Sequence, residues 1–182
     1  MIRIFIDGSA WNILHELKLD LRQELPPNEF ELYLTREVEI ELLAIPDTVT
    51  DDSDKVGLKK YIAESRNRSG IKVVAHFGFR ESGPTAAPFG HGTFPSASER
   101  ARLEEFRPFF FNKSKRPTGL AKNQADASLA ARSFDHIVLT NDNSGGPLAD
   151  AARKGAMVVR IGGFDPKARS LRDYILEALH ST

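Results

Sequence analysis

One stretch, residues 122–159, restricts the fold of this chain more than any other part of the sequence. It reads KNQADASLAARSFDHIVLTNDNSGGPLADAARKGAMVV, which predicts a helix, a strand, a turn, a second helix and a second strand. The segment IVLT within it is almost continuously apolar, and such runs are typical of strands that a parallel sheet buries on both faces. Because strand and helix segments alternate along the rest of the chain, the sequence predicts a three-layer α/β/α sandwich around a mostly parallel sheet.

The 182 residues are predicted to form one domain, residues 1–182, with a long loop and a helix inserted around residues 80–122. Residues 80–95 are rich in Gly and Pro and lack periodicity, which indicates a surface loop. Ser96 and Glu99 form a capping-box pattern that predicts a helix start, and Pro108 with the apolar cluster at residues 109–111 is expected to close that helix. Other strands are predicted over residues 2–6, 30–34, 71–79 and 157–161.

The composition excludes several classes of protein. The chain has no cysteine, so it has neither disulfides nor thiolate zinc sites nor cysteine nucleophiles. The N-terminal segment has an acidic residue in its first apolar run and does not resemble a signal peptide, and no apolar stretch approaches the length of a transmembrane helix. These features predict a cytoplasmic protein with no membrane partner. Its 25 basic and 25 acidic residues cancel, so a polyanion would have to be held by a local patch or by a metal ion.

Four acidic residues are the candidate functional side chains. Asp7 follows the first predicted strand, and Asp142 follows the strand of sequence IVLT. Because ligands bind at the carboxyl ends of the strands in open α/β sheets, these two side chains are expected at the same edge. Asp126, in the first turn of a helix, and Glu41, on the helix after the short strand 30–34, are candidates to reach that edge.

Each candidate also has a purely structural explanation. Asp is favoured in turns, an acidic residue in a first turn stabilises a helix N-terminus, and Glu41 could pair with Arg36 or Lys59. Carboxylates crowded at one edge, however, repel one another unless they are protonated or neutralised. A hard divalent cation, Mg²⁺ or Mn²⁺, removes that repulsion because it prefers carboxylate oxygens and water. Together the four residues predict a metal site.

Four segments in order resemble the PIN-domain superfamily of ribonucleases, which includes VapC-type toxins. They are IFIDGSAWN, EIELL, NQADASLAA and IVLTND followed by LADAARKGAMVV. They span the chain from end to end, although its central third contributes little. The NYN-type relatives, with the same fold and chemistry, are a close second match through LTNDNSGGPLADAARKG.

The resemblance implies a Mg²⁺- or Mn²⁺-dependent ribonuclease with a PIN-like fold, acting on single-stranded or structured RNA. Carried over position by position, the family's metal-binding and catalytic acids correspond to Asp7, Glu41, Asp126 and Asp142. These four residues are called the acidic cluster below. RNA is the implied substrate, and a cognate antitoxin or other protein partner, a homodimer, and a toxin or RNA-processing role stay open.

The sequence departs from the family pattern in three places. Glu37, Glu39 and Glu41 all lie in the second segment, and Glu41 is chosen because the family's acid commonly precedes a leucine. Asn143 and Ser144 stand where a final acidic residue is often found, so one or two metal ions could bind. The chain is also longer than the small toxins of the family, and the surplus falls in the inserted loop and helix.

Functions other than a nuclease fit the sequence less well. A catalytically weak or inactive module that binds RNA or a protein partner is the alternative, and the missing final acid favours it. A haloacid-dehalogenase-type phosphatase would have a second aspartate where Ser9 stands. No P-loop motif is present, and the five histidines lack paired metal-ligand spacing.

A basic segment leads into the helix of Asp126 and is predicted to hold RNA phosphates beside the metal. Trp11, together with Phe89 or His91, is expected to stack on single-stranded bases. A solvated, mobile basic loop is the equally weighted alternative. The basic residues in question are Lys113, Lys115, Arg116 and Lys122.

Overall fold

The computed structural model describes residues 1–47, 54–76, 92–93, 96–110 and 116–180. Its centre is a six-stranded sheet in the order β4-β3-β2-β1-β5-β6, and every pair of neighbouring strands is parallel. The strands are β1 (Ile2–Ile6), β2 (Phe30–Thr35), β3 (Lys72–His76), β4 (Gly92–Thr93), β5 (Ile137–Thr140) and β6 (Val158–Arg160).

The first strand, β1, lies in the middle of the sheet. It pairs with β2 on one side, where Phe5 is opposite Tyr33, and with β5 on the other, where Ile4 is opposite Ile137. Strands β2 and β3 extend the sheet in one direction, and β5 and β6 extend it in the other. The border between β1 and β5 is therefore the topological switch point, and the crevice at the carboxyl ends of such strands is the usual ligand site of open α/β sheets.

The central strands are apolar because the sheet is covered on both faces. Ile4, Ile6, Leu34, Val138 and Leu139 have no exposed surface, and each buried aliphatic side chain of this size contributes about 1.5–3 kcal/mol. A charged residue at any of these five positions would be left unpaired in the core. The position of the carboxyl edge is thus fixed by packing.

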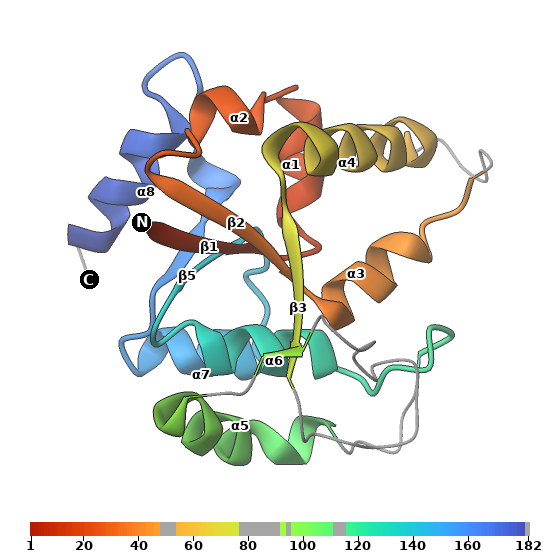
Figure 1. The fold of residues 1–182 in the computed structure, drawn as a ribbon, viewed down its shortest axis with the longest axis vertical. Coiled ribbons are helices and arrows are strands. Elements are labelled where there is room, and N and C mark those ends of the chain that lie inside the picture. Colours follow the sequence, from red (N-terminus) through yellow and green to blue (C-terminus); the bar gives the residue numbers. More distant parts are fainter. Residues whose placement is uncertain (48–53, 77–91, 94–95, 111–115, 181–182) are drawn as a thin grey trace.

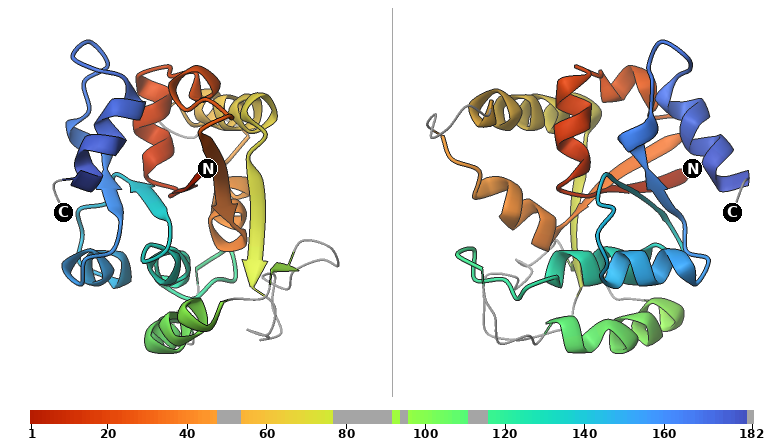
Figure 2. Two further views of the ribbon diagram at one scale, coloured as in Figure 1. Left: turned by 60° about the vertical axis from the view of Figure 1, so that its left-hand side comes forward. Right: turned by 180° about the vertical axis from the view of Figure 1, so that it is seen from behind.

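Helices cover both faces of the sheet (Figure 1). Figure 2 shows α1, α2, α4 and α8 on one face, α6 and α7 on the other, and α5 on the outer side of α6. Helix α3 follows β2 directly and contacts α6. Within the described ranges, every helix is too short or too polar to traverse a lipid bilayer. The helices are α1 (Ala10–Glu16), α2 (Leu21–Glu24), α3 (Arg36–Leu43), α4 (Lys55–Ser69), α5 (Ala97–Phe110), α6 (Gln124–Arg132), α7 (Pro147–Arg153), α8 (Leu171–His180) and the 3-10 helix η1 (Ile161–Gly163).

The predicted three-layer α/β/α sandwich with a mostly parallel sheet is confirmed. The predicted capping box is also present: the Glu99 N–H donates to Ser96 Oγ at 3.1 Å, and the Ser96 N–H donates to Glu99 Oε2 at 3.3 Å. Pro108 lies inside α5, which ends at Phe110, within the segment that was expected to close the helix. The proline removes one hydrogen bond near the C-terminal end of the helix, and Phe109 in the last turn packs against the hydrophobic core. Most of the loop predicted at residues 80–95 lies outside the described residues.

Candidate active site

Asp7, the first residue after β1, is held by two hydroxyl groups. Ser9 Oγ donates to Asp7 Oδ2 at 2.5 Å, and Thr140 Oγ1 donates to the same oxygen at 2.8 Å. Each hydroxyl also accepts a hydrogen bond from a backbone N–H of the segment that leaves β5. The Asn141 N–H donates to Ser9 Oγ at 2.9 Å, and the Asp142 N–H donates to Thr140 Oγ1 at 3.0 Å. A hydroxyl has one proton to donate, so these contacts agree with both protons pointing at Asp7. The aspartate is only 5% exposed and is fixed to the end of β5.

Asp142 lies on the segment that leaves β5. Its carboxylate accepts hydrogen bonds from the Ser144 N–H at 2.7 Å and from Ser144 Oγ at 2.8 Å, a local turn of the kind that aspartate favours. Ser144 thus donates both of these hydrogen bonds to Asp142. The turn explanation considered for Asp142 therefore holds, and it does not exclude a second role.

The first turn of α6 brings Asp126 to the same edge of the sheet. Burial raises the pKa of Asp126 to about 6, the charges of Asp7 and Asp142 act in the same direction, and the nearby Arg116 opposes them. Repulsion of this kind requires carboxylates that are close together in a partly desolvated place. Asp126 is thus a neighbour of both Asp7 and Asp142. The positions of Asp7 and Asp142 after their strands had predicted that these two residues share an edge.

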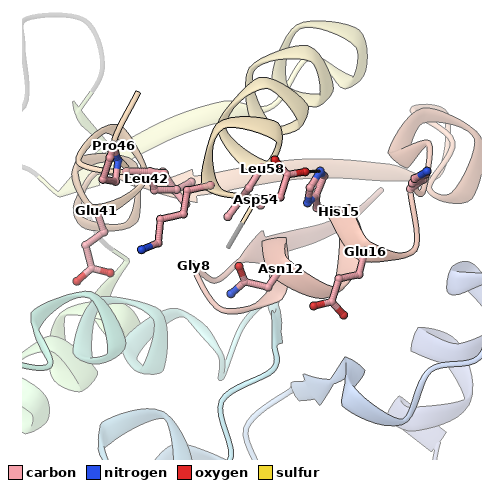
Figure 3. Close-up of a pocket in the computed structure, with 12 residues that line it drawn as sticks. Gly8, Asn12, His15, Glu16, Glu41, Leu42, Pro46, Asp54 and Leu58 are labelled. Carbon is pink, nitrogen blue, oxygen red and sulfur yellow. Dashed lines mark ion pairs between the residues drawn. The ribbon is translucent and has the colours of Figure 1, made fainter. Parts of the chain in front are cut away.

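Glu41 reaches the cluster from α3. Burial is the main cause that raises the pKa of Glu41, Arg116 lowers it, and the charges of Asp126 and Asp7 raise it again. A Cβ placed on Gly8 would lie 3.9 Å from Glu41 Oε2, so this carboxylate comes close to the turn after β1. Figure 3 shows the Glu41 side chain extending from α3 towards α6. Asp126 therefore interacts with each of the other three members of the acidic cluster, and Glu41 also interacts with Asp7.

The other two glutamates of α3 have different partners. Glu37 accepts a hydrogen bond of 3.0 Å from Ser128 Oγ on α6. Glu39 forms ion pairs with Arg36 and, at 2.6 Å, with Arg66. Glu41, by contrast, lies close enough to Asp126 and Asp7 for their charges to raise its pKa.

The side chains of the acidic cluster are not arranged as a ready-made metal site. Among the described residues, no three His, Asp or Glu side chains form a group that could hold a metal ion in their present positions. Glu41 is turned to Arg116, and Asp142 is turned to Ser144. The contact with Ser144 is exposed, and the Arg116 side chain is 47% exposed, so these partners can be exchanged at modest cost. By donor chemistry the four carboxylates fit a hard divalent cation, and binding would need at least one of these two side chains to change partner.

The predicted basic segment is only partly described. Lys113 and Lys115 lie outside the described residues. Arg116 forms an ion pair with Glu41, so it belongs to the edge that carries the acidic cluster. Lys122 is exposed, two residues before α6.

The expectation that Trp11 stacks on RNA bases is wrong. Trp11 is completely buried and its ring lies edge-on to Tyr61, with 6.1 Å between centroids. The apolar spacing of α1 places this side chain in the core, where it packs beneath α4. Phe89 and His91, the other two predicted stacking residues, lie outside the described residues.

A groove of about 760 Å³ begins beside the acidic cluster. Figure 3 shows Glu41 near one end and His15, Asp54 and Glu16 farther along. The sequence did not indicate this groove, because α1, α3 and α4 come from separate segments. The two hydroxyl groups that donate to Asp7 were not predicted either. The available signal was a Ser or Thr two residues from each aspartate at a strand end, Ser9 after Asp7 and Thr140 before Asp142. The lining residues are Gly8, Asn12, His15, Glu16, Lys18, Glu41, Leu42, Ile45, Pro46, Asp54, Lys55 and Leu58.

A search with protein-family models and a search of curated proteins both gave no match to this chain.

Proposed function

We propose that this chain is a Mg²⁺- or Mn²⁺-dependent ribonuclease that uses the acidic cluster to cleave phosphodiester bonds of single-stranded or structured RNA. The observation that carries the proposal is that several carboxylates lie together in a partly buried place, where burial and mutual repulsion both disfavour their charges. Asp126, with a pKa raised to about 6, lies beside two other aspartates at the switch point of a parallel sheet. Unneutralised carboxylates destabilise such a place, and a hard divalent cation relieves the repulsion.

Each member of the acidic cluster has a role in this proposal. Asp7, Asp126 and Asp142 are ligands, and Glu41 is a ligand or orients the attacking water. A divalent ion bound there would activate that water and offset the charge that develops on the scissile phosphate. Ser9 and Thr140 hold Asp7 in one orientation, so the protein contributes a preset ligand.

The alternative is a non-catalytic module that binds RNA or a protein partner. Two observations favour it: the described residues contain no ready-made metal group, and Ser144 occupies a position where the related family often has an acid. Thermal unfolding in a Mn²⁺ titration separates the two functions, because an ion that binds only the folded state raises its apparent stability. A nuclease shows a rise at millimolar Mn²⁺, and the module shows none.

The experiment that tests the nuclease is cleavage of a labelled single-stranded RNA by the purified protein. We expect cleavage with Mn²⁺ or Mg²⁺ and none after chelation with EDTA. Cleavage that persists in EDTA would exclude the metal-dependent mechanism. If Mn²⁺ raises the thermal stability of the protein but no RNA is cleaved, the chain is a metal-binding module without nuclease activity.

Whether the nuclease acts as a toxin is a separate prediction. Growth arrest on induced expression, relieved by Asp126→Ala, would support a toxin role, whereas normal growth would favour RNA processing. The cytoplasmic location, a cognate antitoxin or other partner, and a homodimer stay predictions of the sequence.

A further inference from the structure

Arg116 is a cation placed among the carboxylates of the acidic cluster. Its guanidinium forms an ion pair with Glu41. It also lowers the pKa of Asp126, against the larger effect of burial and the charges of Asp7 and Asp142. The guanidinium is therefore the counter-charge that the described part of the cluster has in the absence of metal.

A compact turn holds Arg116 at this place. The Arg116 N–H donates to the Leu120 carbonyl at 2.8 Å, and the Gly119 N–H donates to the Arg116 carbonyl at 2.9 Å. Gly119 has a φ of 81°, a conformation that glycine adopts without strain. Leu120 and Ala121 are 1% and 5% exposed, so they anchor the turn in the core. The Arg116 side chain is nevertheless 47% exposed, which leaves it accessible to a ligand.

Arg116 and a metal ion would compete for the same carboxylate if Glu41 is a ligand. The ion pair engages Glu41, and no ready-made metal group exists among the described residues while that pair is closed. The Arg116 side of the pair is 47% exposed, so the guanidinium can leave Glu41 at modest cost. A guanidinium released from Glu41 would stay at the cluster, because its turn is anchored, and its planar fork suits a phosphate group.

We propose that Arg116 exchanges partners during the reaction cycle, pairing with Glu41 in the metal-free protein and with an RNA phosphate once metal occupies the acidic cluster. This inference rests on the proposed nuclease function. It gives a chain of zero net charge a phosphate-binding residue at the site of cleavage. It also makes metal binding and RNA binding cooperative, since each favours the state in which the ion pair is open.

The test compares wild type with Arg116→Ala and Arg116→Lys, and uses Arg3→Ala as the matched control. Arg3 has a similarly exposed side chain in an ion pair with Glu31, but it lies near the amino end of β1. Calorimetry gives the Mn²⁺ affinity without RNA. Fluorescence anisotropy gives the affinity for a cleavage-resistant single-stranded 2′-O-methyl phosphorothioate oligonucleotide, with Mn²⁺ and with EDTA.

We expect Arg116→Ala to bind Mn²⁺ several-fold more tightly, because a competing cation is gone. In Mn²⁺ it should bind the oligonucleotide about tenfold more weakly, which is the scale of one charge-assisted hydrogen bond. The loss in EDTA should be smaller. Arg116→Lys should keep near-wild-type Mn²⁺ affinity and recover only part of the oligonucleotide affinity, since it lacks the planar fork. Arg3→Ala should match wild type in both assays.

Two results would overturn the exchange while leaving the nuclease intact. One is an unchanged oligonucleotide affinity of Arg116→Ala in Mn²⁺, which would mean that Arg116 holds no phosphate. The other is a weaker Mn²⁺ affinity of Arg116→Ala, which would mean that the ion pair positions Glu41 for the metal. Wild-type protein that neither binds Mn²⁺ nor cleaves RNA would overturn the nuclease and the exchange together.

Discussion

Thr140 and Asp7 lie at the carboxyl ends of adjacent parallel strands, and the Thr140 hydroxyl donates a hydrogen bond of 2.8 Å to Asp7 Oδ2. The same hydroxyl accepts the backbone N–H of Asp142 at 3.0 Å. Thr140 has no exposed surface, so one buried side chain fixes two members of the acidic cluster relative to each other. The hydroxyl is therefore expected to matter for both stability and metal binding.

Replacing Thr140 with Val keeps the shape and removes the hydroxyl. We expect the free energy of unfolding to fall by about 2 kcal/mol, because a buried carboxylate oxygen and an N–H each lose a partner, and Mn²⁺ to bind more weakly. Urea unfolding and calorimetry measure the two effects. Ser133→Ala is the control: it removes a buried hydrogen bond of 2.8 Å to the Ala130 carbonyl after the C-terminal end of α6, and should lower stability alone. Equal Mn²⁺ affinity in Thr140→Val and wild type would show that the hydroxyl does not orient a ligand.

Two glutamates one helical turn apart should respond differently to the same substitution. Glu41→Gln removes a carboxylate that interacts with Asp7 and Asp126, so it should weaken Mn²⁺ binding. Glu37→Gln weakens the contact with Ser128 and should cost up to about 1 kcal/mol of stability, with little change in Mn²⁺ affinity. Calorimetry on both variants measures their Mn²⁺ affinities. Weaker Mn²⁺ binding by Glu37→Gln than by Glu41→Gln would assign the metal ligand to Glu37 instead.

The parallel sheet and the edge that carries Asp7 and Asp142 followed from the sequence, because both residues come directly after buried apolar strands. Asp126 was predictable for a similar reason, since a helix that packs on the sheet starts near the carboxyl edge. In each case a short-range pattern places the side chain at the carboxyl edge of the sheet: an acidic residue follows a strand or lies in the first turn of a helix.

The partners within the site could not be predicted, because they depend on tertiary packing. Arg116 was predicted to hold RNA phosphates or to belong to a solvated basic loop, and its ion pair with Glu41, beside the turn anchored by Leu120, was not foreseen. Trp11 was expected to bind bases although its spacing in α1 also fitted the core, and its complete burial shows that the apolar pattern was the better guide. Which face of α3 meets the cluster likewise depends on how that helix packs on α6.

The burial of Asp126 and the repulsion around it predict how the stability of the metal-free protein depends on pH. The pKa of Asp126 is about 6 in the folded protein against an ordinary 3.8, so between these values the folded state binds more protons than the unfolded chain. Stability should therefore fall as the pH rises from about 4 to about 6 and stay low above that. Glu41, whose pKa is also raised, contributes with the same sign. Urea unfolding at a series of pH values in EDTA measures the slope.

Asp126→Asn should reduce that slope and raise stability at pH 7 in EDTA. A shift of two pKa units corresponds to about 2.7 kcal/mol at most, partial exposure reduces it, and the lost interaction with the N-terminus of α6 costs about 0.5 kcal/mol. We expect a net gain of about 1 kcal/mol. With Mn²⁺ present the order should reverse, because wild type gains more from the ion. A variant less stable than wild type in EDTA would mean that Asp126 is not under repulsive strain.

The central claim is that the acidic cluster is the catalytic site, and the rate of single-stranded RNA cleavage by Asp7→Asn in Mn²⁺ tests it most directly. Asparagine keeps the shape of Asp7 and removes the charge, and thermal unfolding confirms that the variant is folded. Asp173→Asn, on the exposed side of α8, is the control and should cleave at the wild-type rate. We predict that Asp7→Asn cleaves about a hundredfold more slowly or not at all, the scale of losing a charged group at the reacting centre. Cleavage by Asp7→Asn as fast as by wild type would contradict the assignment of the acidic cluster as the active site.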